Sequence, residues 1–386
     1  MAPVLHGPAG ASGRERAQLA HGSATTGTGG DDDPGIYIDS ATAADIIPPM
    51  ADSSGARLDG LVVAVSLIVV LVLPLAAAAQ SPTTPWGDPD LQGVWDYWTF
   101  TPLERAEEFA GRDALTAEEA ALIGEQGRAA ALATDRDGPA PGNPGAYGQE
   151  VWTERSRATA LRQPSLIVDP PDGKIPTLTA AETSRVAVHQ SSGGRPVRTR
   201  AGGIGADGPE NRGLAERCIV GFSTGPPMLP AGYNNNVQIL QAPGYVALVV
   251  EMIHDVRIVP LGGPGRLAPD VRQWLGTSRG HWEGDTLVVE TTNFTDRIGS
   301  FSTTGQSWGT GADLRLTERF TRVYADTLAY EFTVENPSVF TRPFSARFPM
   351  TRSDLPLYEY ACHEGNYGLY NILFGARSEE RGAAPR

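Results

Sequence analysis

The chain has 386 residues and carries 31 Lys and Arg against 45 Asp and Glu, so its formal net charge at neutral pH is −14. This negative charge argues against binding to nucleic acid or to anionic membrane surfaces, both of which attract basic proteins. Only two cysteines occur, Cys218 and Cys362, and two thiolates alone cannot complete a four-ligand zinc site.

An apolar run near the N-terminus is typical of an export signal. Residues 61–79 read LVVAVSLIVVLVLPLAAAA, follow Arg57 and end in small residues, as a signal-peptidase site requires. We therefore expect residues 50–79 to be a signal peptide and the protein to be periplasmic or secreted. The alternative is an uncleaved anchor in the inner membrane, since about 20 apolar residues span a bilayer.

Residues 1–49 are rich in Gly, Ala, Ser, Thr and Asp and lack the apolar side chains that a core needs. They are either a disordered tail or a stretch upstream of a start at Met50. Residues 80–386 then carry 28 basic and 37 acidic side chains, a net charge of −9. An isolated pair of cysteines in an exported chain predicts a disulfide between Cys218 and Cys362.

Residues 80–150 are predicted to hold a strand, a helix and a linker. Trp95, Trp98 and Phe100 indicate an apolar leading strand. Thr116, with Glu119 three residues later, forms the sequence pattern of a capping box before the helical run AEEAALIGEQGRAAALA. Residues 134–149 have the composition of a loop.

Residues 151–386 are predicted to form an antiparallel β domain, because apolar runs alternate with tight turns. The turns APG at 242–244, EGD at 283–285 and YAD at 324–326 each separate two predicted strands. Two further strands are predicted at FTRPFSARFPMT and LYEYACH. A meander of this length predicts an all-β fold that closes into a lipocalin-like barrel or a sandwich.

One carboxylate interrupts an apolar face of this meander. Leu314, Leu316, Glu318 and Phe320 fall on the same face of their strand, because side chains alternate with a period of two. Glu318 is therefore predicted to point toward the core, where burial would raise the pKa of a carboxyl that acts as a base.

Several longer motifs are distributed along the exported part of the chain: YNNNVQI, EMIHDVRIVPL, GHWEGDTLVVETTNFTD, LTERFTRVYADTLAYEFTVENP and YEYACHEGNYGLYNIL. Together they resemble a group of exported bacterial proteins that carry the WEGDTLVVETTNF block. The resemblance extends from about Trp86 to Arg377. It implies export, and it implies no reaction, cofactor or catalytic residue.

Histidines beside carboxylates are the candidates for catalysis. His254 lies three residues after Glu251, and His363 is followed by Glu364. If the two histidines converge with one carboxylate, they could hold a metal ion or provide a general base. For each pair the alternative is a turn with a structural or solvent-exposed imidazole. No cofactor is predicted otherwise, because the nucleotide-binding and serine-hydrolase motifs are absent from the sequence.

A small-molecule ligand is the other hypothesis, since small antiparallel barrels enclose space for one ligand. Trp282, Tyr330 and Tyr360 would line such a pocket, with Glu251 or Glu318 as its polar groups. Three functions follow: a binding protein for an amphipathic or carbohydrate-like molecule, a metal-assisted hydrolase or lyase, and a structural envelope protein. The sequence does not predict an oligomeric state.

Overall fold

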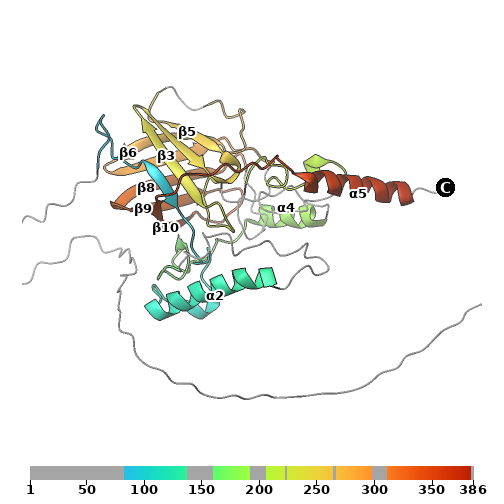
Figure 1. Cartoon of the computed structure of the whole chain (residues 1–386), viewed down its shortest axis with the longest axis horizontal. Helices are drawn as coiled ribbons and strands as arrows, with labels where there is room; N and C mark the ends of the chain where they lie inside the picture. Colours follow the sequence, from blue (N-terminus) through green and yellow to red (C-terminus); the bar gives the residue numbers. More distant parts are fainter. Residues whose placement is uncertain are drawn as a thin grey trace, which may run out of the picture. The chain divides into compact units, whose positions relative to one another are not determined.

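The computed structural model describes residues 82–136, 160–191, 206–221, 224–263, 267–297 and 311–383. They form one antiparallel sheet of ten strands with short helices around it (Figure 1). The strands are β1 (Gly93–Asp96), β2 (Ile167–Asp169), β3 (Asn236–Ala242), β4 (Tyr245–Val250), β5 (Val256–Pro260), β6 (Thr277–Glu283), β7 (Thr286–Thr292), β8 (Arg315–Tyr324), β9 (Thr327–Glu335) and β10 (Phe344–Ser353). The mainly antiparallel β prediction is confirmed.

The order of the strands departs from a simple meander at one place. Nine strands lie in the order β5-β4-β3-β1-β10-β9-β8-β7-β6, and β2 pairs with β10 beside this path. Strand β1 lies between β3 and β10, with Trp95 opposite Val237 on one side and Arg352 on the other. The N-terminal segment therefore contributes a central strand to the sheet.

The two ends of the sheet approach each other where β5 meets β6. Leu261 and Gly280 form an isolated bridge, and a Cβ on Gly280 would lie 2.7 Å from Leu261 Cδ2 and 2.9 Å from Val259 Cγ1. A side chain at position 280 would thus force the ends apart. The bridge shows that the sheet curls until its two edge strands meet. Among the described residues no continuous ladder joins β5 to β6, so closure of the sheet into a barrel is not shown.

One hydrophobic core lies on the inner face of the curled sheet. Alternating residues of β8, β9 and β10 contribute large rings, and Phe320, Tyr330 and Phe348 are essentially unexposed. The Tyr330 ring lies 5.0 Å from that of Phe320 and 5.2 Å from that of Phe348. Residues 224–229, of sequence TGPPML, are all buried, and the Met228 amide donates a hydrogen bond to the Tyr330 hydroxyl. This loop therefore fills space inside the core.

The predicted N-terminal helix is α2 (Ala117–Arg136). Its capping box is confirmed, because the Glu119 amide donates to Thr116 Oγ1 and the Thr116 amide donates to Glu119. The predicted leading strand is shorter than expected, since β1 ends at Asp96, and Trp98 and Phe100 follow it in irregular chain.

The described residues also form two α-helices and three short 3₁₀ helices that were not predicted. They are α4 (Ala180–Ser191) and α5 (Tyr367–Ala383), with η1 (Glu107–Phe109), η3 (Pro209–Asn211) and η4 (Met252–His254). The predicted strand LYEYACH is wrong, because residues 357–363 have irregular backbone. Strand β10, which precedes this segment, already pairs with β1 and β9, so neither of its edges is free for another central strand.

The export signal at 50–79 and the upstream residues 1–49 lie outside the described residues. Of the loop predicted at 134–149, residues 134–136 instead belong to the end of α2, and residues 137–149 lie outside the described residues. Within the described part of the chain, none of the helices has the length and apolarity needed to cross a bilayer.

Candidate functional site at the disulfide end of the sheet

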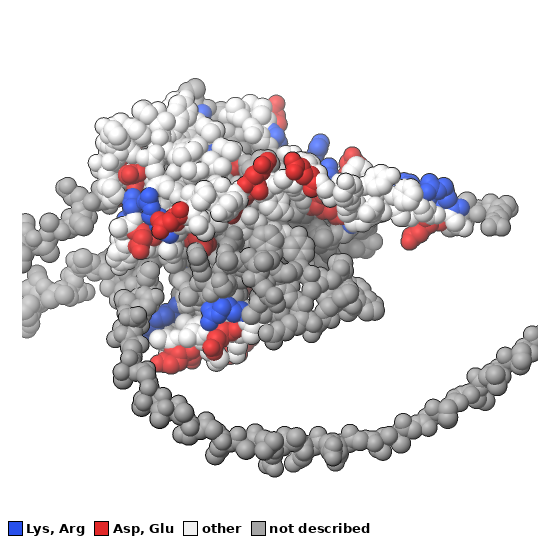
Figure 2. All heavy atoms as spheres, in the orientation of Figure 1, with Lys and Arg blue, Asp and Glu red and all other residues white. Residues whose placement is uncertain are grey.

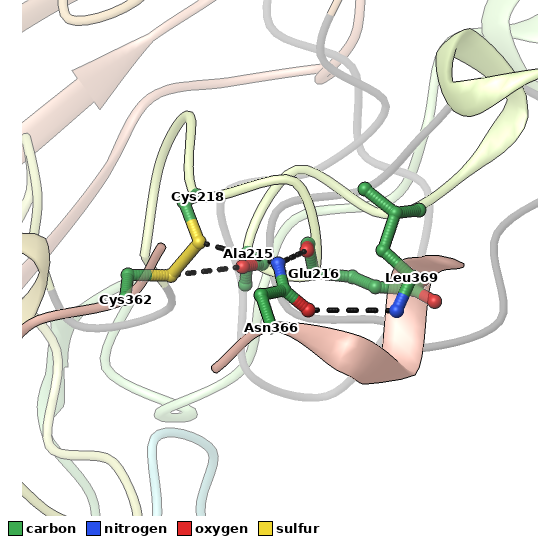
Figure 3. Close-up of a disulfide and its surroundings, with 6 residues drawn as sticks. All are labelled: Ala215, Glu216, Cys218, Cys362, Asn366 and Leu369. Carbon is green, nitrogen blue, oxygen red and sulfur yellow. Dashed lines mark hydrogen bonds between the residues drawn. A yellow bond between two sulfur atoms is a disulfide. The ribbon is translucent and has the colours of Figure 1, made fainter. Parts of the chain in front are cut away.

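The predicted disulfide between Cys218 and Cys362 is present (Figure 3). It joins residues 144 positions apart, with their Cα atoms 5.7 Å from each other. Cys218 lies within a turn in which the Ile219 amide donates to the Leu214 carbonyl. The bond therefore connects the loop before β3 to the segment after β10, and it is compatible with an oxidising environment.

Asn366 holds the same two segments together. Its Nδ2 donates to the Glu216 carbonyl at 3.0 Å and lies 3.6 Å from Cys218 Sγ (Figure 3). Its Oδ1 accepts from the Leu369 amide at 3.4 Å, which is the N-cap contact of α5. One side chain thus fixes both the loop and the start of the helix.

A buried carboxylate, Glu251, lies where the YNNN, EMIHD and YEYACHEGN segments converge. It is 3 % exposed. Asn236 Nδ2 donates to one carboxylate oxygen at 2.8 Å, and the Tyr358 amide donates to the other at 3.3 Å. The Glu251 amide donates in turn to the Asn236 carbonyl. Three segments distant in sequence are therefore joined at this carboxylate.

Three non-glycine residues around this convergence have left-handed backbone. Cys218, Asn234 and Ile253 have φ of 57°, 55° and 61°. For β-branched Ile253 this conformation is a true outlier, which costs about 1–3 kcal/mol and persists only when packing enforces it. A Cβ on Gly221 would lie 2.4 Å from Met252 Cγ and 3.2 Å from Ile253 Cδ1, so this close packing fixes the strained turn.

The predicted histidines flank this region. His254 ends η4 directly after the strained Ile253, and its side chain lies outside the described residues. His363 and Glu364 lie in an exposed turn beside the disulfide. Within the described residues, no three His, Cys, Asp or Glu side chains form a group suited to a metal ion. The metal site formed by His254 and His363 remains a prediction.

Glu318 lies in the core, as its place on an apolar face predicts, and it is completely buried. Arg257 Nη1 and Nη2 donate to its two oxygens at 2.5 and 3.0 Å, and the Tyr330 hydroxyl donates at 2.7 Å. Burial and the Glu318 charge raise the pKa of Tyr330 well above its ordinary value. Without an opening of the core, a ligand in solvent reaches neither Glu318 nor Tyr330.

Arg257 is the partner of Glu318 that was not predicted from the sequence. Burial lowers its pKa and the Glu318 charge raises it, and the net direction is upward, so the guanidinium stays charged. In β5 the apolar residues face solvent and the charged residue faces the core, the opposite of the usual pattern. Val256 and Ile258 are 49 % and 56 % exposed, whereas Arg257 between them is buried. The predicted burial of Glu318 could have indicated that a residue such as Arg257 pairs with it, because a buried charge requires a partner.

Two of the predicted pocket aromatics lie at the edge of the core. Trp282 on β6 and Tyr360 after β10 are both partly buried and pack against the main core. His281, beside Trp282, is exposed and contacts Glu283 at 3.1 Å. These rings contribute to packing.

The outer face of the sheet has a shallow groove of about 230 Å³. It is lined by Thr286, Arg319, Thr321, Val323, Ala329, Glu331 and Arg347. Its charges neutralise each other or near neighbours, because Arg347 pairs with Glu331 at 2.6 Å and Arg319 with Glu283 at 2.9 Å. The charged side chains of the groove are therefore less able to bind a polar ligand than the Glu251 carboxylate is.

No protein-family model, curated protein or solved structure matches the chain. The chemistry of the Glu251 region is therefore the basis for the function proposed next.

Proposed function

We propose that the protein is an exported binding protein that holds a small carbohydrate-like ligand at the disulfide end of the sheet. Glu251 is the polar anchor in this proposal, and the exposed Tyr358 ring is the apolar surface beside it. The export signal in the sequence and the disulfide between Cys218 and Cys362 both support a role outside the cytoplasm.

The buried carboxylate of Glu251 carries the proposal. A carboxylate offers about four lone-pair positions for hydrogen bonds, and the two donors described above, Asn236 Nδ2 and the Tyr358 amide, occupy one position on each oxygen. Glu251 is 3 % exposed, so a ligand reaches the remaining positions when the exposed side chains around it, including Tyr358, move aside. These positions suit vicinal hydroxyl groups, because a hydrogen bond to a charged acceptor is stronger than one between neutral groups. Since both donors hold the carboxylate in place, it loses little freedom on binding.

An aromatic ring next to this carboxylate completes the surface. Tyr358 is 63 % exposed although its backbone amide contacts the buried Glu251. Leu355, three residues earlier, is 47 % exposed. A sugar ring presents hydroxyls at its edge and C–H groups on its faces, so a carboxylate beside an apolar ring matches both.

We infer that the ligand binds outside the core, because the interior is filled. The TGPPML loop and the Arg257–Glu318 pair occupy the space in which a lipocalin-like barrel would hold a ligand. We keep the barrel as the architecture of the curled sheet, closed by side-chain packing between β5 and β6, with the binding surface at one end of it.

A hydrolase is the second candidate, and the strained Ile253 favours it. Strained backbone is concentrated at active sites, and Ile253 stands between Glu251 and His254. In this alternative the bound sugar is cleaved, with the Glu251 carboxylate or the His254 imidazole as the general base.

The test is a glycan array followed by calorimetry on the non-reduced chain produced in an oxidising periplasm. Glu251→Gln is expected to weaken binding of a hit about 10- to 100-fold, because a hydrogen bond to a charged group contributes about 1.5–3 kcal/mol. Glu359→Gln, an exposed carboxylate next to Tyr358, is the matched control and leaves the affinity unchanged.

Three results separate the candidates. Product released from a hit glycan, and lost in both Glu251→Gln and His254→Ala, favours the hydrolase. Affinity that is the same in Glu251→Gln and in wild type refutes the proposed site. An array without hits refutes the carbohydrate ligand and favours a structural envelope protein.

A further inference from the structure

The C-terminal helix α5 exposes an unusual number of aromatic side chains. Tyr367, Tyr370 and Phe374 are 73 %, 65 % and 54 % exposed. Figure 1 shows α5 extending away from the sheet, and in Figure 2 its surface is uncharged near the start and carries charged side chains near its end. A cluster of exposed rings on one helix marks an interaction surface more often than isolated apolar residues do.

These rings share one face with two arginines. At 100° per residue, positions 367, 370, 374, 377 and 381 fall within an arc of about 80°. The Tyr370 and Phe374 rings are stacked, with their centroids 6.0 Å apart, and the Arg381 guanidinium lies 5.9 Å from the Phe374 ring centre. The face is thus aromatic in its first half and basic in its second half.

The disulfide end of the sheet fixes the direction of this helix. Asn366 caps α5 and bonds to the loop that contains Cys218, and Cys362 lies five residues before the helix starts (Figure 3). The face is therefore presented by a restrained helix, which reduces the entropy lost on association.

We propose that α5 pairs antiparallel with α5 of a second copy of the chain, about a two-fold axis at the level of Ile372. In this register Tyr370 of each copy faces Phe374 of the other, and Tyr367 faces Arg377. Aromatic pairs and cation–π contacts each stabilise such an interface. A two-fold interface requires a self-complementary face, and the aromatic-then-basic order along α5 meets this requirement.

Charges at the ends of the helix agree with the same register. Position 381 of one copy falls opposite His363 of the other and next to Glu364, so Arg381 can reach this carboxylate. Glu380, which falls opposite Glu364, is paired with Arg377 in its own chain. Within one chain the two ends of α5 are separated by about 26 Å, from 17 residues at 1.5 Å each. Arg381 and Glu364 therefore cannot pair inside a single copy.

This face of α5 is less suited to a membrane surface than to a second copy of the helix. Helices that lie on anionic lipid have a predominantly basic polar face, whereas Glu379 and Glu380 offset Arg377 and Arg381 on α5.

A single helix offers less than the roughly 800 Å² per partner of a standard interface. The dimer is therefore expected to be weak, with a Kd of about 1–100 µM.

Sedimentation velocity of the non-reduced protein between roughly 1 and 500 µM, a range that spans the expected Kd, tests the pairing. We expect a reversible monomer–dimer equilibrium that Tyr370→Ser with Phe374→Ser weakens at least tenfold. Tyr324→Ser removes an equally exposed ring from the β8–β9 turn and is the control. Far-UV circular dichroism checks that α5 remains helical in each variant.

A charge exchange makes the test specific to the register. Arg381→Glu and Glu364→Arg are each expected to weaken the dimer, and the double variant to restore it. A monomer throughout the concentration range overturns the proposal. So does a dimer that is indifferent to the α5 variants, or a double variant no better than the single ones. Cosedimentation of the monomer with vesicles of phosphatidylglycerol would assign the face to lipid.

Discussion

The buried ion pair between Arg257 and Glu318 leads to a quantitative prediction. Glu318→Gln keeps the shape of the side chain and removes its charge. Glu318 is fully buried and Arg257 has only 4 % of its side chain exposed. The substitution therefore leaves a guanidinium without a counter-ion inside the core, and it weakens three hydrogen bonds.

The expected loss is about 3–5 kcal/mol of unfolding free energy, the range measured when one member of a buried pair is removed. The assay is urea unfolding of the non-reduced protein, followed by tryptophan fluorescence. With a slope of about 3 kcal/mol/M, the midpoint falls by roughly 1–1.7 M. Glu331→Gln breaks the partly exposed pair with Arg347 and should cost less than about 1 kcal/mol.

A double variant completes the test. Arg257→Met with Glu318→Met removes both charges and should recover most of the loss, because apolar replacement of a whole buried pair is often neutral. The reasoning is refuted if Glu318→Gln costs less than about 1 kcal/mol, or if the double variant is no more stable than the single one.

Two further predictions concern Tyr330 and Asn366. The pKa of Tyr330 is raised in the folded state. The folded protein therefore keeps the hydroxyl proton above about pH 10, while the unfolded chain loses it. Above that pH the free energy of unfolding should fall by about 1.4 kcal/mol per pH unit. Urea titrations from pH 9 to 11 measure this slope, and Tyr330→Phe should reduce it, whereas an identical slope would contradict the assignment. Asn366→Ala removes the N-cap of α5 and should cost about 1 kcal/mol, seen as faster hydrogen exchange at the Leu369 amide. Asn371→Ala, within the exposed face of the same helix, is its control and should leave that exchange unchanged.

Features of the fold that depend on local sequence were predictable. Alternation placed Glu318 on the inner face, and the register confirms this placement, because Glu318 lies opposite the buried Phe332. The capping box at Thr116 is likewise local, since its two hydrogen bonds join residues three apart.

Features that depend on strand order were not predictable from one sequence. Arg257 lies between two apolar residues and would be assigned to the outer face, but the curvature of the sheet brings β5 opposite the buried Glu318. Similarly, Glu251 could be suspected from its nearness to His254. Its contact with the Tyr358 amide, 107 positions away, follows only once β10 returns beside β1.

The position of β1 between β3 and β10 has a consequence for the order in which the sheet is completed. Synthesis from the N-terminus delivers residues 93–96 long before residues 344–353. Until the last strand arrives, β1 has a partner on one side at most, and Cys218 has no Cys362 with which to react. The nascent protein is thus left with an open sheet edge for most of its synthesis, and such edges bind other extended chains. Its demand for a chaperone should end only when roughly the final 40 residues emerge and the disulfide links them to the loop before β3.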